Sequence, residues 1–189
     1  MKRWLLVAMI AALTACNKPH PAGTDESSVV VFSGTGFSLE PGAGWIRVSM
    51  KSLSKPLKQT IAEPALTAGG VTIQVAQLGD RVAEPAVLAQ VQGAFDKDPQ
   101  AISDSLKKDD FQTDSGVRGK FFRYSRHSEH APQRVLNHLT QYVVRSANGR
   151  WISIGVLTDT IEHAGEVDAM IRRTLREVPT TSPTPKPAQ

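Results

Sequence analysis

Cysteine is almost absent from this chain, because Cys16 is the only cysteine in 189 residues. A single thiol excludes an intramolecular disulfide and any metal site built from several cysteines. Long apolar runs are also missing. The run from Trp4 to Ala15 falls short of the roughly twenty residues that a membrane-spanning helix needs. This run is therefore not expected to be a transmembrane anchor.

Common catalytic motifs are missing as well. The sequence contains no G-x-S-x-G, no G-x-x-x-x-G-K-[ST] and no H-E-x-x-H. The glycine-rich stretch FSGTGFSLEPGAGWIRV, Phe32 to Val48, does not make G-x-G-x-x-G, because Leu39 stands three positions after Gly36. Trp45–Val48 continues as a strand pattern, so no helix N-terminus is available for a phosphate. We expect a non-enzymatic protein, with a hydrolase of unidentified nucleophile as one alternative.

The charge balance gives little support for a nucleic-acid partner. The formal net charge is +4, and removal of residues 1–15 with Lys2 and Arg3 lowers it to +2. A small net charge with mixed signs leaves no electrostatic footprint for nucleic acid. No nucleic-acid partner is expected.

The first sixteen residues are typical of an export signal. Lys2 and Arg3 precede the apolar run, as in a secretory signal peptide. The end of the run, Leu13-Thr14-Ala15-Cys16, resembles the bacterial lipobox. The resemblance implies cleavage after residue 15 and acylation of Cys16, which would anchor the protein in a membrane. The alternative is an ordinary secretory peptide with a chance cysteine.

Asn17 bears on the choice of membrane. In the enterobacterial sorting pattern, Asp at this position favours retention in the inner membrane, so Asn indicates transfer to the outer membrane. In a Gram-negative source, the protein would then sit in the inner leaflet of the outer membrane and face the periplasm.

Composition divides the mature chain into three parts. Residues 16–28 contain the lipidated cysteine and a polar tether rich in Pro, Gly, Ser and charge. Residues 29–178 suit a single domain. Residues 179–189 alternate Pro with Ser and Thr and are expected to be disordered. A proline-rich ligand for a partner is the alternative for this tail.

Several short patterns predict antiparallel strands. Val71, Ile73 and Val75 alternate with more polar residues, which is typical of a half-buried strand. Asn148-Gly149 predicts a hairpin between 133–146 and 150–158. Ser115-Gly116 predicts another hairpin, which pairs 111–117 with 120–128. We therefore expect a meander of at least four strands.

Three segments predict helices. The first is Glu84–Phe95, with Pro85 in its first turn. A second is expected to begin with Asp98 as N-cap and to run towards Leu106. The last is expected over His163–Glu177. One-sided helices need a sheet to cover, so the expected fold class is α+β, with helices packed on an antiparallel sheet.

This order of elements resembles the PsbP/DcrB-like α/β/α sandwich, which a eukaryotic Ran-binding import factor also shares. The matching residues are Gly36–Pro41 followed by Gly44-Trp45, then Tyr142–Val144, Asn148–Trp151 and the C-terminal helix. The resemblance covers nearly all of residues 30–178. It implies the fold and supplies no catalytic residues.

The densest polar cluster is RHSEH, which contains His127, Glu129 and His130. Imidazole and carboxylate are good zinc ligands, and His138 on a neighbouring strand could add a fourth. On a regular strand His130 would point away from the other two, so the three converge only if a turn lies there. The alternative for the cluster is a solvated hairpin end. His138 is itself expected to be partly buried and hydrogen-bonded.

Other notable side chains are expected to have structural roles. Trp45 and Trp151 are interpreted as core residues. A scattered basic set is interpreted as solubilising, with an anion site as the alternative, and comprises Lys55, Lys58, Lys107, Lys108, Arg118, Lys120, Arg123 and Arg126.

Together, these features predict a non-enzymatic, lipid-anchored envelope protein without a cofactor. Its domain would bind another envelope protein or a cell-wall component. A small-ligand or metal carrier that uses His127, Glu129 and His130 is the alternative, and an envelope hydrolase is the third possibility.

Overall fold

The computed structural model of the protein describes residues 29–48, 61–80, 82–127 and 135–178. All of them belong to the predicted domain 29–178, whereas Cys16, the tether and the tail lie outside the described residues. No helix in these ranges is long and apolar enough to cross a membrane.

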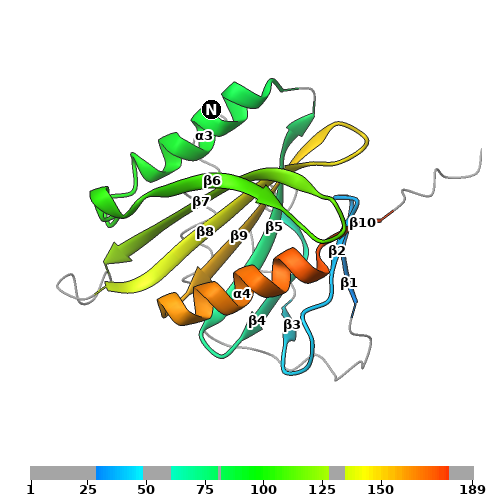
Figure 1. The fold of residues 1–189 in the computed structure, drawn as a ribbon, viewed down its shortest axis with the longest axis horizontal. Coiled ribbons are helices and arrows are strands. Elements are labelled where there is room, and N and C mark those ends of the chain that lie inside the picture. Colours follow the sequence, from blue (N-terminus) through cyan, green and yellow to red (C-terminus); the bar gives the residue numbers. More distant parts are fainter. Residues whose placement is uncertain (1–28, 49–60, 81, 128–134, 179–189) are drawn as a thin grey trace, which may run out of the picture.

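The largest element of the fold is a seven-stranded antiparallel sheet with the order β3-β4-β5-β9-β8-β7-β6 (Figure 1). Its strands are β3 (Ile46–Val48), β4 (Ile61–Ala68), β5 (Val71–Asp80), β6 (Lys107–Gln112), β7 (Arg118–His127), β8 (Val135–Arg145) and β9 (Arg150–Thr158). The predicted meander is confirmed as β6-β7-β8-β9, and both predicted hairpins are present.

A second, three-stranded sheet lies at one end of the molecule. It consists of β1 (Val30–Phe32), β2 (Phe37–Leu39) and β10 (Arg176–Glu177), with β2 in the middle. Residues 40–45, with a turn at Ala43 and Gly44, therefore separate two strands, β2 and β3, that belong to different sheets. The glycine-rich stretch leads the chain from the small sheet into the large one.

Two helices cover opposite faces of the large sheet. Helix α3 (Glu84–Phe95) lies on one side and α4 (Ile161–Thr174) on the other, as Figure 1 shows. Val87 and Val91 of α3 pack with Phe122 and Val143, whereas Val167 and Ile171 of α4 belong to the larger cluster around Tyr142 and Ile154. The molecule is a mixed α+β domain, as predicted.

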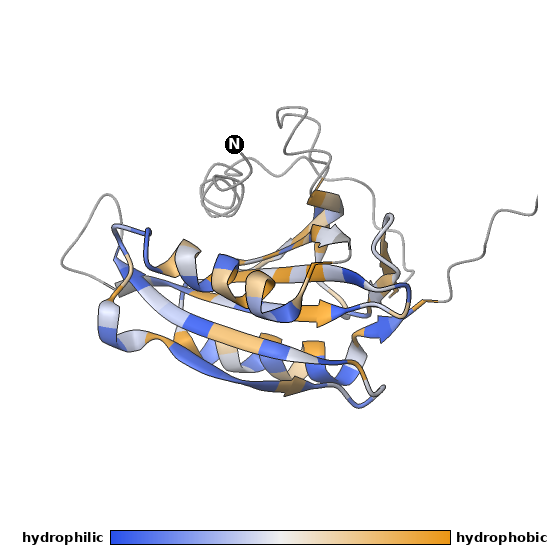
Figure 2. Cartoon of the chain, turned by 90° about the horizontal axis from the view of Figure 1, so that it is seen from above, coloured by the Kyte–Doolittle hydropathy of each residue, from blue (hydrophilic) through white to orange (hydrophobic). Residues whose placement is uncertain are grey.

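Strand β5 is buried more completely than its sequence pattern predicts. Val71, Ile73 and Val75 face α4, and Gln74 and Ala76 on the other face are also buried, with Gln74 0% exposed. The prediction of a half-buried strand was wrong because β5 lies between β4 and β9 and has a helix on each face. Figure 2 shows hydrophilic and hydrophobic residues interspersed along the strands and helices.

The predicted helix after Asp98 is absent. A short 3₁₀ turn, η2 (Ser103–Ser105), and a bridge between Ala101 and Arg126 occupy this segment instead. The Asp98 carboxylate does accept a hydrogen bond from the backbone N–H of Gln100 (3.0 Å). It is also held by Arg126, so the residue anchors a loop to β7.

The last helix was predicted to extend too far. Helix α4 ends at Thr174, and Arg176 and Glu177 pair with Ser38 and Phe37 of β2. Of the two tryptophans predicted in the core, Trp151 is confirmed as buried. Trp45 is half-buried against the larger core cluster, the one that contains Val167 and Ile171 of α4 and is called the α4-side core below.

Candidate functional site

Of the predicted metal cluster, the structure describes His127 alone. His127 is the last residue of β7, and its side chain is half-buried, with Nδ1 buried and without a hydrogen-bond partner. Glu129 and His130 lie outside the described residues. Within the described ranges, no group of three His, Cys, Asp or Glu side chains is placed to hold a metal ion. The three-residue site therefore stays a prediction.

His138 lies on β8 opposite Ser125 of β7. Its Nδ1 is 3.0 Å from the Ser125 hydroxyl oxygen, and its side chain is half-buried. Burial lowers the pKa of His138 below its usual value of 6.5, and the nearby Arg123 guanidinium acts in the same direction. The prediction of a partly buried, hydrogen-bonded histidine is confirmed.

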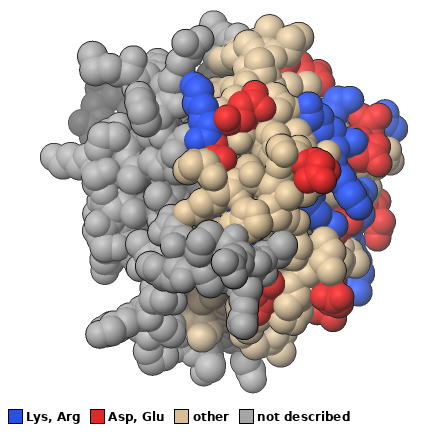
Figure 3. Space-filling model, turned by 90° about the vertical axis from the view of Figure 1, so that its left-hand side faces the viewer, with Lys and Arg blue, Asp and Glu red and all other residues tan. Residues whose placement is uncertain are grey.

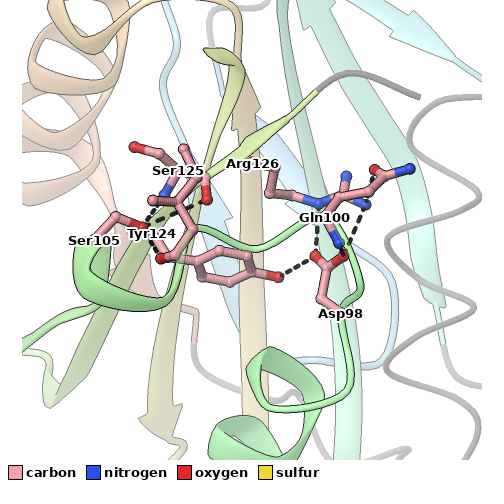
Figure 4. Close-up of polar contacts among 7 residues, drawn as sticks. Asp98, Gln100, Ser105, Tyr124, Ser125 and Arg126 are labelled. Atoms are coloured by element: carbon pink, nitrogen blue, oxygen red, sulfur yellow. Dashed lines mark hydrogen bonds and ion pairs between the residues drawn. The ribbon is translucent and has the colours of Figure 1, made fainter. Parts of the chain in front are cut away.

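The most densely connected polar cluster joins Asp98, Gln100, Tyr124 and Arg126 on the α3 face (Figure 4). Arg126 donates from Nε to Asp98 Oδ2 (2.6 Å) and from Nη2 to Gln100 Oε1 (2.9 Å). Tyr124 donates its hydroxyl proton to Asp98 Oδ2 (3.1 Å). Both charged side chains are almost fully buried, with 6% of Arg126 and 3% of Asp98 exposed.

This cluster fixes the loop between α3 and β6 to strand β7. The His127 N–H donates to Gln100 O and the Ile102 N–H donates to Ser125 O, which adds backbone bonds on both sides of Arg126. The Ser125 N–H also donates to the Ser105 hydroxyl (2.9 Å). The interpretation of Arg126 as a solubilising residue was wrong, because its guanidinium lies in the interior opposite a carboxylate.

The Asp98 cluster has little capacity for catalysis. Its carboxylate already accepts from Tyr124, Arg126 and the Gln100 backbone. Burial, together with the Asp98 charge, raises the pKa of Tyr124 far above its usual value of 10.0, so the phenol stays protonated. The Asp98 carboxylate is already occupied by hydrogen bonds and the Tyr124 phenol stays protonated, so the cluster provides neither a free base nor a nucleophile. This indicates a structural role.

A different polar group on the same face is unsatisfied. Gln74 and Ser153 are both 0% exposed, and neither the carboxamide of Gln74 nor the hydroxyl of Ser153 has a hydrogen-bond partner. An unpaired buried polar group costs about 1–3 kcal/mol of stability. Sequence reasoning missed both residues because their positions within alternating strands were assigned to a solvent-facing side.

Comparisons with known proteins identify the fold alone. No protein-family model and no curated protein sequence matches the chain. Among solved structures, the chain is similar to the solution structure of cyanobacterial PsbP (CyanoP) from Synechocystis sp. PCC 6803, with a TM-score of 0.50 and 15% sequence identity. The match covers 84% of this chain and 98% of that one. The PsbP-like fold expected from the sequence is therefore present.

Proposed function

We propose that the protein is a non-enzymatic, lipid-anchored lipoprotein of the cell envelope, whose domain binds another envelope protein or a cell-wall component. The observation behind this proposal is the position of Cys16 at the end of Leu13-Thr14-Ala15-Cys16, directly after a short apolar run. The tether of a dozen residues from Asn17 reaches at most about 40 Å when fully extended, so the domain works close to its membrane.

The described part of the fold favours binding over catalysis. Its most connected polar cluster, around Asp98 and Arg126, is saturated by internal hydrogen bonds. Figure 3 shows Lys and Arg interspersed with Asp and Glu on the face that it draws, so charge of one sign does not dominate there. Such a surface suits a protein or cell-wall partner better than nucleic acid.

Replacement of Cys16 tests the lipid anchor. Cys16→Ala is expected to move the protein from the membrane fraction to the soluble fraction of the envelope, because the acyl chains have no other attachment site. Metabolic labelling with a palmitate analogue is expected to mark the wild type and not the variant. Membrane association that is unchanged in Cys16→Ala contradicts the anchor.

Asn17 tests the choice of membrane. In a Gram-negative host, Asn17→Asp is expected to shift the protein from the outer-membrane to the inner-membrane fraction of a density gradient, with Asn17→Gln as the matched control. An outer-membrane location for all three forms would show that Asn17 does not decide the sorting.

A metal carrier is the second candidate, and the unpartnered Nδ1 of His127 favours it. A buried imidazole nitrogen without a hydrogen bond is available as a zinc ligand. Metal analysis of the full chain after exposure to zinc is expected to show one bound ion, and His127→Gln is expected to lose it. His163→Gln, which alters an exposed histidine paired with Asp159, is the control. A zinc-free wild type excludes this candidate.

A further inference from the structure

Strand β1 forms one edge of the small sheet, and its outer side has no partner strand among the described residues (Figure 1). The other side of the sheet shows which backbone groups of β1 point outward. The Val178 N–H donates to Gly36 O. In this register the pair of Arg176 and Ser38 is also hydrogen-bonded, so Ser38 directs its N–H and C=O towards β10. Val31 lies opposite Ser38, and its own N–H and C=O therefore point away from β2, to the open edge.

The residue two positions earlier agrees with this direction. Val29 points the same way as Val31, because the orientation of backbone groups repeats every two residues along a strand. Its carbonyl accepts a hydrogen bond from Arg47 Nη2 of β3 at 3.2 Å. Among the described residues, the Val31 backbone has no such partner on its outer side. An unpaired donor and acceptor at a sheet edge form a template for a further strand.

The side chains of β1 divide into a buried and an exposed set. Val30 and Phe32 are 3% and 1% exposed and pack in the α4-side core. Val29 and Val31 alternate with them and are 44% and 54% exposed. The strand is therefore held firmly from one face, and it presents two apolar side chains on the other face beside its open edge.

Two other edge strands carry charged side chains. Strand β6 begins with four charged residues, and the Asp110 N–H donates to Asp109 Oδ1 at 2.7 Å, so the side chain covers a backbone donor. Strand β10 consists of Arg176 and Glu177, both exposed. Charged side chains at an edge oppose pairing with another strand. Strand β1 has no charged residue, so the protection seen at β6 and β10 is missing there.

We propose that β1 pairs with β1 of a second copy of this chain, in an antiparallel arrangement with a two-fold axis at Val31. The Val31 N–H of each copy donates to the Val31 carbonyl of the other, and Val29 of each copy lies opposite Ser33 of the other. A two-fold contact sets its central residue against itself. Valine meets its own copy without repulsion, whereas a charged residue at the centre would face a like charge.

The tether gives the reason why the occupant is a second copy. Residues 17–28 end directly before Val29, so in every anchored copy β1 lies within about 40 Å of the membrane. Anchoring holds identical edges in one layer and raises their effective concentration. This step rests on the proposed lipid anchor, whereas the open edge does not. A short ladder is weak by itself, so the dimer is expected at the membrane and a monomer in dilute solution.

Cysteine crosslinking of the full lipidated chain in membranes tests the register. Val31→Cys is expected to form a disulfide-linked dimer under mild oxidation, because hydrogen-bonded partners on adjacent strands have Cα atoms about 5.5 Å apart, within the range of a disulfide. Val29→Cys is the matched control, with the same residue type on the same face. The two copies of residue 29 are four positions out of register, about 14 Å along the strands, so this variant is expected to crosslink at least tenfold more slowly.

A second pair of variants tests the same register from another side. Val29→Cys and Ser33→Cys, produced together, are expected to crosslink to each other. Addition of Val31→Lys to both chains is expected to abolish this product, because two like charges then meet at the axis. Val31 is exposed, so Val31→Lys is expected to leave the thermal unfolding midpoint unchanged. The unaltered chain, whose Cys16 is acylated, is expected to give no crosslink.

Several results would overturn the proposal. Equal crosslinking rates for Val31→Cys and Val29→Cys would indicate random collisions, and a main product that joins Val31→Cys to a different protein would make that protein the occupant of the edge. Absence of dimer both in membranes and in a concentrated solution of the Cys16→Ala chain would exclude the pairing. Dimer in concentrated solution, without a gain at the membrane, would contradict the lipid anchor and leave the edge contact in place.

Discussion

Two histidines near one end of the large sheet have opposite electrostatic environments. His138 is half-buried between β7 and β9, and burial lowers its pKa. His163 lies on α4, and its Nδ1 is 2.6 Å from Asp159 Oδ1, which raises its pKa. The same residue type is therefore expected to favour the folded state in different pH ranges.

We predict that an NMR titration of the imidazole signals separates these residues, with His138 titrating below the usual value of 6.5 and His163 above it. The sign for stability follows. As pH falls below about 6.5, the unfolded chain binds a proton at position 138 before the folded chain does, so the His138 contribution is lost. The His163 contribution is complete below about 6.5 and is lost as pH rises through the folded-state pKa. Identical midpoints for the two signals would contradict the structure.

The buried pair of Asp98 and Arg126 gives a second prediction at this scale. Asp98→Ala is expected to lower the free energy of unfolding by about 3–5 kcal/mol, because Arg126 then stays buried without its carboxylate. Urea unfolding measures this change. Asp110→Ala breaks the exposed pair with Lys120 and is the matched control, expected to leave the urea midpoint almost unchanged. Equal effects of the two variants would show that burial of the Asp98 pair has no special consequence.

These residues also show how far the sequence alone can lead. Trp151 was predicted in the core from its type, and its burial agrees. Asp98 before Pro99 has the chemistry of an N-cap, and that chemistry is used in the bond to Gln100 N–H. Its pairing with Arg126 could not be predicted, because 28 positions separate the two residues and no local pattern joins them.

The elements with strong local signals were predicted most accurately. Helix α3, the β6–β7 hairpin and the β8–β9 hairpin follow from periodicity and turn residues. Gly69-Gly70 between β4 and β5 is a further turn signal of the same kind, and both glycines have positive φ. The end of α4 was predicted wrongly because Arg176 and Glu177 suit a helix by composition but pair with β2, which is distant in sequence.

The start of α4 allows a test at the scale of one element. The Thr160 hydroxyl accepts a hydrogen bond from the His163 N–H at 3.1 Å, which makes Thr160 the N-cap. Thr160→Ala is expected to lower the free energy of unfolding by about 1 kcal/mol, and Thr160→Ser, which keeps the hydroxyl, by much less. Thermal unfolding of both variants measures the difference. Equal losses would indicate that the methyl group of Thr160, rather than its hydroxyl, stabilises the protein.

At the scale of the whole molecule, the sequence predicted helices packed on an antiparallel sheet. It did not predict which strands pair when they are far apart in the chain. The hairpins give the order β6-β7-β8-β9 directly, since each strand pairs with the next. The pairing of β5 with β9 and of β2 with β10 brings together segments far apart in the chain. The same long-range arrangement buries the unpaired side chains of Gln74 and Ser153 on one face of the sheet, which could be found only in the folded structure.

This arrangement predicts that the two sheets differ in local stability. Strands β5, β8 and β9 have partners on both sides and a helix on each face, so their amides are expected to exchange only through global unfolding. Strand β10 has two residues and a single partner, and its amides are expected to exchange through a smaller opening. Native-state hydrogen exchange by NMR, at increasing urea, measures both free energies.

A core substitution in the small sheet sharpens this test. Val30 of β1 is 3% exposed and packs in the α4-side core. If the small sheet opens by itself, Val30→Ala speeds the exchange of β1 and β2 amides more than that of β9 amides. If both sheets form one cooperative unit, the variant speeds exchange at all these positions by the same factor. We expect the first result, because among the described strands β1, β2 and β10 pair with one another and not with the large sheet, and their ladders are two or three residues long.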